Sequence, residues 1–172
     1  GKIYPTVQKQ VLVKQMPFLK KEFIHSKDYA NATVSEILPK KEFSEALTLR
    51  ASMLETCWWE NQGGKFVRHI LPNQAQVSPV FGILAHDFNG DGKTDLLLAG
   101  NKYGMEAETS RCDAGNGAFF SGDGKGNFTW VDNRQSGFWA TKEVRDLALL
   151  QGAGGKVKVL VSNNNDRVQV YG

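Results

Sequence analysis

The pattern of apolar and polar positions changes character near residue 47. Before it, Lys and Glu are frequent, Gly is scarce, and apolar residues recur at mixed steps of three and four. Such spacing places apolar side chains on one side of a helix, so it predicts two to four short helices in residues 1–46. Residues 47–172 instead contain short apolar runs bounded by Gly, Asn or Asp, which is typical of strands and tight turns.

Two runs indicate which side chains are buried. The run "DLLLAG" does not alternate with polar residues, so we expect a strand that is covered on both faces. Trp58 and Trp59 are adjacent on another strand, so they should point to opposite faces, with one of them in the core. The predicted strands are 54–60, 65–71, 80–86, 93–100, 117–121, 127–132, 143–150, 156–162 and 167–171.

An internal repeat is visible at an offset of about 62 residues. The turn "NQGGKF" (61–66) aligns with "DGKGNF" (123–128), "LLAGN" with "LVSNN", and "ILAH" with "RDLA". A period of this length with four strands is typical of a β-propeller blade. The predicted fold is therefore mainly β: a partial propeller of about two four-stranded antiparallel blades over 47–172, complete in about 80–132, after a helical segment over 1–46. An ordinary sandwich with similar turns is the alternative.

About two blades cannot close a ring, because propellers usually have four to eight. The chain is then expected to belong to a larger protein, to associate with copies of itself, or to cover its open edge with the N-terminal helices.

Bulk properties exclude some classes of partner. The 172 residues are 41% hydrophobic and 23% charged, as in an ordinary globular domain. A net charge of +3 is too small to predict a nucleic-acid partner. The sequence has no apolar run of the roughly 20 residues that a membrane span needs. Cys57 and Cys112 could pair or stay free.

The clearest candidate chemistry is the loop "DFNGDGKTD" (87–95). Calcium takes six to eight oxygen ligands, and alternating Asp and Asn side chains in a tightly wound loop supply them. Leu98 stands where an EF-hand has its bidentate Glu, so the EF-hand interpretation fails and a strand–loop–strand site is predicted. A solvated turn and another divalent ion are the alternatives. The predicted calcium ligands are the side chains of Asp87, Asn89, Asp91 and Asp95 and the backbone oxygen of Lys93.

A second candidate is the long connection over residues 101–116. Long loops on a rigid strand scaffold often bind ligands. This one also combines acidic and basic residues that could simply form ion pairs with each other. The predicted ligand-binding residues are Tyr103, Glu108, Arg111 and Asp113.

The stretch "VFGILAHDFNGDGKTDLLLAG" resembles the FG-GAP/VCBS repeat. Phe81-Gly82 matches the opening of its first strand, and Asp87–Leu96 matches D-x-N-x-D-G-x-x-D-L, whereas the Gly-Ala-Pro part is absent. The resemblance extends over about 53–171. With the helical segment, the chain resembles the C-terminal part of long bacterial FG-GAP/VCBS proteins related to the CRTAC/ASPIC-UnbV group.

The resemblance implies an integrin-α-type propeller, secreted or on the bacterial cell surface, with calcium bracing its blades. In the copy at 143–171, the 62-residue offset aligns Asp87, Asp91 and Asp95 with Leu149, Ala153 and Val157, so one calcium ion is expected. We expect a non-enzymatic segment that binds a protein, a glycan or the remaining blades of a parent chain. The alternative is part of an extracellular enzyme acting on polysaccharide, with catalytic residues partly outside this segment; a calcium sensor is disfavoured.

Overall fold

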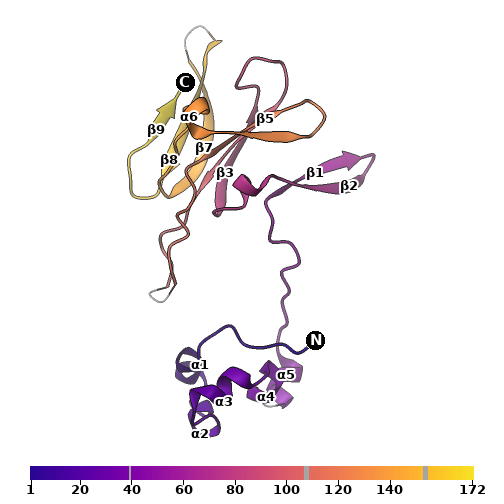
Figure 1. Ribbon diagram of the computed structural model, residues 1–172, viewed down its shortest axis with the longest axis vertical. Coiled ribbons are helices and arrows are strands. Elements are labelled where there is room, and N and C mark those ends of the chain that lie inside the picture. Colours follow the sequence, from indigo (N-terminus) through magenta and orange to yellow (C-terminus); the bar gives the residue numbers. More distant parts are fainter. Residues whose placement is uncertain (39, 107–108, 153–154) are drawn as a thin grey trace. The chain divides into compact units, whose positions relative to one another are not determined.

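The computed structural model describes residues 1–38, 40–106, 109–152 and 155–172. Contacts divide the chain into two compact units, Gly1–Ser52 and Met53–Gly172 (Figure 1). The helices are α1 (Lys9–Gln15), α2 (Leu19–Glu22), α3 (Ser26–Asn31), α4 (Val34–Ile37), α5 (Lys40–Glu45), the 3-10 turn η1 (Asn73–Ala75) and α6 (Asn133–Ser136). The strands are β1 (Cys57–Gln62), β2 (Lys65–Ile70), β3 (Val80–His86), β4 (Asp95–Gly100), β5 (Ala118–Gly122), β6 (Phe128–Val131), β7 (Val144–Gln151), β8 (Val157–Asn163) and β9 (Gln169–Tyr171).

The first unit contains α1 to α5, so the described residues form one short helix more than the two to four expected. The extra element arises because breaks in the pattern divide the segment into helices of seven residues or fewer. Thr33 and Glu36 form a capping box at the start of α4. The small core of this unit consists of Leu19, Tyr29, Ala32 and Ile37.

The second unit is mainly β and contains three antiparallel sheets. We call β1–β2 the first sheet, β3–β4–β5–β6 the second sheet and β7–β8–β9 the third sheet (Figure 1). The predicted strands are confirmed, with small shifts at their ends. The expectation of about two four-stranded blades is only partly right, because one sheet has four strands and the others have two and three. The described residues form no closed propeller.

The second and third sheets share a backbone pattern that confirms the internal repeat and corrects its offset. Both first strands carry a register irregularity, between Val80 and Gly82 and between Val144 and Asp146, which are 64 residues apart. The second strands are 63 apart, since Leu98 pairs with Ile83 as Val161 pairs with Leu147. The predicted alignment of "LLAGN" with "LVSNN" spans 63 residues and agrees with these strands, whereas that of "ILAH" with "RDLA" is two residues short, because Ile83 corresponds to Leu147.

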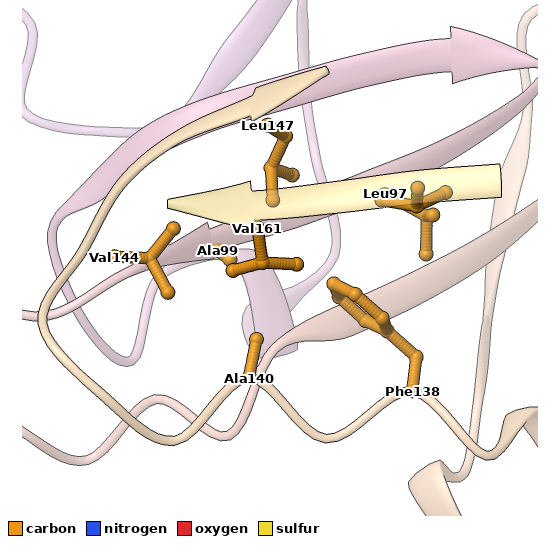
Figure 2. Packing of buried hydrophobic residues seen from close by; sticks show 8 residues of the cluster. Leu97, Ala99, Phe138, Ala140, Val144, Leu147 and Val161 are labelled. Atoms are coloured by element: carbon orange, nitrogen blue, oxygen red, sulfur yellow. The ribbon is translucent and has the colours of Figure 1, made fainter. Parts of the chain in front are cut away.

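A cluster of buried apolar residues forms the core between the second and third sheets. Leu97 and Ala99 of β4 belong to one buried cluster with Val144, Leu147 and Val161 of the third sheet and with Phe138 and Ala140 (Figure 2). The predicted double burial of "DLLLAG" is confirmed, because all six residues of β4 are buried.

Gly82 lets the first strands of these two sheets approach each other. A Cβ atom at this position would lie 2.7 Å from Cγ of Leu147 and 3.0 Å from its backbone nitrogen. Any larger residue would therefore push β3 away from β7. This packing requirement explains the glycine of the Phe81-Gly82 pair.

The first sheet packs on the opposite face of the second sheet. Trp58 contacts Phe128 edge to face, with ring centroids 6.3 Å apart, and stacks on His69 at 4.3 Å. Trp59 points to the other side, where its side chain is 47% exposed. The prediction that one tryptophan of the pair is core holds in part, because Trp58 is half-buried and packs against the buried cluster that contains Leu98 and Phe120.

Candidate metal centre

The acidic loop joins β3 to β4, so a strand flanks it on each side. Gly90 and Gly92 have φ angles of 78° and 80°, in the region that favours glycine. His86, at the end of β3, contacts Phe88 edge to face, with 5.3 Å between ring centroids. Its imidazole thus packs on an aromatic ring at the start of the loop.

Asp87 organises the loop by accepting hydrogen bonds from its backbone. Its Oδ1 accepts from the N–H of Gly90 at 2.7 Å and of Asp91 at 3.1 Å, and its Oδ2 accepts from Gly92 at 2.8 Å. These bonds, that from Gly92 foremost, lower the pKa of Asp87 below its ordinary value, and nearby His86 contributes. The carboxylate therefore stays ionised at neutral pH.

Asn89 and Asp91 lie on the exposed outer turn of the loop. Oδ1 of Asn89 accepts from the N–H of Asp91 at 2.9 Å, and its amide donates to Oγ of Ser121 at 3.3 Å. Oδ1 of Asp91 accepts from the N–H of Lys93 at 2.9 Å, and Oδ2 lies 3.4 Å from Nζ of Lys93. The contribution of the Lys93 carbonyl stays a prediction.

Asp95 differs from the other acids because it is fully buried. Its Oδ2 accepts from the N–H of Phe88 at 3.0 Å, and its Oδ1 accepts from the N–H of Gly122 at 2.9 Å. One side chain thus joins the start of the loop to the end of β5. A buried carboxylate is tolerated there because each oxygen receives a hydrogen bond.

The loop offers the oxygen ligands that calcium prefers, although its carboxylates do not point toward one common centre. Among the residues that the structure describes, no three His, Cys, Asp or Glu side chains form a group able to hold a metal ion. Instead, each predicted side-chain ligand is turned toward backbone N–H groups. A carboxylate has about four lone-pair sites, so these hydrogen bonds leave acceptor capacity on each Asp. Gathering the oxygens around an ion would require Asn89 and Asp91 to turn inward.

Comparison with known families identifies one repeat within the chain. Residues 82–120 match the FG-GAP repeat. The repeat runs from β3 to β5 and contains the whole acidic loop. No curated protein matches the chain, and no solved structure matches it. The expected relation to bacterial CRTAC/ASPIC-UnbV proteins and the expected C-terminal position therefore have no support from these comparisons.

The FG-GAP repeat also contains the loop of the second candidate site. Lys102 and Cys112 form an isolated antiparallel bridge at its base, and the guanidinium of Arg111 lies 5.1 Å from the ring centroid of Tyr103. The hydroxyl of Tyr103 donates to the carbonyl of Thr141 at 3.1 Å. The structure thus brings Tyr103 and Arg111 together and leaves Asp113 exposed, while Glu108 lies outside the described residues.

Asn101 and Glu143 are buried polar residues that the sequence patterns did not single out, and each links the start of the 101–116 connection to residues 141–143. Asn101 is fully buried with a φ of 80°, and its amide donates to the carbonyls of Gly115, Thr141 and Lys142. Glu143 accepts from the N–H of Tyr103 at 3.1 Å. An Asn follows both "LLAG" and "LVSN" in the sequence, and this repetition is the signal that could have identified Asn101. The backbone N–H of Asn101 donates to the carbonyl of Pro79, and that of Asn164 donates to the carbonyl of Glu143.

Cys57 and Cys112 are both free thiols. Among the described residues the longest helix, α1, has seven residues, so none has the length and apolar character to cross a membrane.

Proposed function

We propose that this chain is a propeller-type interaction domain whose acidic loop binds calcium. The FG-GAP repeat at residues 82–120 carries the proposal, because this repeat suggests an interaction domain built from propeller blades. The oxygen-donor set of the loop, Asp87, Asn89, Asp91, Asp95 and the Lys93 carbonyl, supports the calcium part.

Bound calcium would neutralise the loop acids and hold the turn between β3 and β4. Asp87 is already ionised and preorganised by three backbone N–H groups, so it would be the entry ligand. Asn89 and Asp91 are exposed and able to turn toward the ion. Because calcium would bind the folded chain alone, it would raise stability by mass action.

Calcium binding is tested by isothermal titration and by thermal melting with calcium or with a chelator. We expect the melting temperature to rise with calcium and Asp91→Ala to abolish the rise. Asp123→Ala is the matched control, because Asp123 also accepts backbone N–H bonds, from Lys125 and Asn127, but lies in a different turn. An unchanged calcium response in Asp91→Ala would contradict the site.

The proposed partner is a protein or a glycan outside the chain, and the proposed location is extracellular or on the cell surface. Extracellular modules bind calcium with dissociation constants of about 10⁻⁴–10⁻³ M, which suits an exposed loop of this kind. Binding arrays with purified glycans and pull-downs with surface proteins test the partner class. We propose binding without catalysis, so turnover of a bound polysaccharide would favour the enzyme alternative. Cell fractionation tests the location.

A further inference from the structure

The turn between β5 and β6 contacts the acidic loop on one side and the first sheet on the other. We call residues 123–127 the β5–β6 turn. It is held together by Asp123, whose Oδ1 accepts from the N–H of Lys125 at 2.7 Å and of Asn127 at 3.1 Å. The amide of Asn127 also donates to Oδ2 of Asp123 at 2.6 Å. Because these bonds join its two ends, the turn can move as one piece.

The end of β5 is fixed to the acidic loop at Gly122. Its N–H donates to Oδ1 of the buried Asp95 at 2.9 Å. A Cβ atom at Gly122 would collide with the carbonyl oxygen of Thr94, so the two backbones lie in direct contact there. A hydrogen bond that is shielded from water is electrostatically stronger than an exposed one. We therefore expect Gly122 to stay in place as a pivot when the loop rearranges.

Two other contacts between the loop and this hairpin involve residues that calcium would move. The amide of Asn89 donates to Oγ of Ser121 at 3.3 Å. The stem of Lys93 lies beside Gly124, where a Cβ atom would be 3.4 Å from its Cγ, and Nζ of Lys93 lies 3.4 Å from Oδ2 of Asp91. Calcium binding would turn Asn89 and Asp91 inward. The contact with Ser121 would then break, and Lys93 would lose its ion pair.

On its other side, the β5–β6 turn packs against Trp58 of the first sheet. A Cβ atom at Gly126 would lie 2.7 Å from Cζ2 and 2.8 Å from Cη2 of Trp58, so the close approach requires a residue without a side chain. Phe128, the first residue of β6, contacts the same indole edge to face. His69 of β2 stacks on Trp58, with 4.3 Å between ring centroids. A displacement of the turn therefore changes the surroundings of Trp58.

We propose that the β5–β6 turn couples the acidic loop to the first sheet, so that calcium binding changes how the first sheet packs on the second. This inference rests on the proposed calcium site and adds a consequence of its occupancy. The turn pivots at Gly122 as the contacts of Ser121 and Gly124 with the loop change. Its movement reaches Trp58 through Gly126. A ligand shifts such an arrangement only if it favours one form of the loop, as calcium would by drawing its ligands inward.

Nuclear magnetic resonance of the full chain tests the coupling through the indole N–H signals of its four tryptophans. Trp58→Phe identifies the signal of Trp58. As calcium is added, we expect this signal to shift with the same midpoint as the backbone signals of Gly90 and Gly92. Trp59 is the internal reference, because its side chain lies on the other face of the same strand, and its signal should shift far less. Isothermal titration of the same sample measures calcium binding independently.

Two substitutions outside the acidic loop should weaken the coupling. Ser121→Ala removes the contact with Asn89, and Asn127→Ala removes the side-chain bond that stiffens the turn. The double variant should bind calcium in the titration, but its Trp58 shift should be largely lost. If the double variant does not fold, as judged by circular dichroism, each single variant should show a reduced shift.

Ser162→Ala is the matched control. Ser162 also lies on a strand and also has a side-chain hydrogen bond, to the carbonyl of Asp146, but it belongs to the third sheet. This variant should keep the full Trp58 shift, and a loss of the shift there would contradict a route through the turn.

The possible results separate this inference from the proposed function. A chain that binds no calcium in the titration would overturn both. A chain that binds calcium without a shift of the Trp58 signal would overturn the coupling alone and leave the calcium site standing. Equal shifts of Trp58 and Trp59, or a full shift in the double variant, would also overturn the coupling, because the change would then not be transmitted through the turn.

Discussion

The hairpins β3–β4 and β7–β8 have the same backbone pairing but different connecting loops. Both carry an irregularity in the first strand, and in both an Asn after the second strand binds a carbonyl before the first. The acids do not recur, since the register places Gln151 at the position of Asp87 and Lys158 at that of Asp95. The hairpin therefore forms without the acids, which makes them a specialisation of one copy.

The corrected register changes which residues are compared but keeps the expectation of one calcium site. The predicted offset aligns Asp87 and Asp95 with Leu149 and Val157, and Asp91 with Ala153, which lies outside the described residues. The β7–β8 connection is one residue shorter, because His86 pairs with Asp95 nine positions on, whereas Leu150 pairs with Lys158 eight positions on. Neither alignment places a carboxylate opposite Asp87 or Asp95.

The largest difference between the copies should appear at the two asparagines. Asn101→Ala leaves buried donors and acceptors without partners and places alanine at a φ of 80°, so it should destabilise the chain by about 4 kcal/mol. Asn164 is exposed and donates one side-chain bond, to Glu143, so Asn164→Ala should cost about 1 kcal/mol. Urea unfolding measures both values, and equal costs would contradict the proposed role of Asn101.

The second-largest difference in stability should appear between substitutions of Gly82 and of its counterpart Asp146. Gly82→Val forces a side chain against Leu147, so we expect a loss of about 3 kcal/mol, at the upper end for overpacking. Asp146 is exposed, so Asp146→Ala should change stability by no more than about 0.5 kcal/mol. Thermal unfolding tests the pair. A Gly82→Val variant as stable as the wild type would show that the two sheets can move apart.

The counterparts Asp95 and Lys158 test the role of the buried acid. In Asp95→Asn, an amide N–H₂ would face the N–H of Phe88 or of Gly122, which loses its acceptor, at a cost of about 2 kcal/mol. Lys158 is exposed, so Lys158→Asn should stay within about 0.5 kcal/mol. Both are measured by unfolding in a chelator, so that calcium does not contribute. If Asp95→Asn left the stability unchanged, the hydrogen bonds of Asp95 would not stabilise the fold, and metal binding would be its remaining role.

The smallest expected effect is on pH dependence. Hydrogen bonds from the amide of Asn164, then from the N–H of Tyr103, and the nearby Arg145 lower the pKa of Glu143. Glu143 therefore stabilises the chain above the carboxyl pKa of the unfolded state, and this contribution is lost as pH falls through its folded pKa. Stability measured from about pH 5 to pH 2 should fall less steeply in Glu143→Gln. Asn164→Ala should reduce the slope in the same direction, and an unchanged slope in both would exclude this origin.

Much of the second unit could be predicted from local patterns. Alternation and turn residues located the strands. The run "DLLLAG" predicted a strand buried on both faces, because it does not alternate with polar residues. The helical segment was harder, since helices of seven residues or fewer give little periodic signal. The acidic loop was located correctly between two strands, but the pattern could not tell which acids turn toward backbone N–H groups.

By itself, the sequence determined the strand order, the repeated hairpins and an oxygen-rich loop, because these depend on residues close together along the chain. Only the tertiary structure decided the register of the third sheet, the burial of Asp95 and the link through Asn101. Those features depend on atoms that are distant in sequence, such as the N–H of Gly122 and the carbonyl of Thr141.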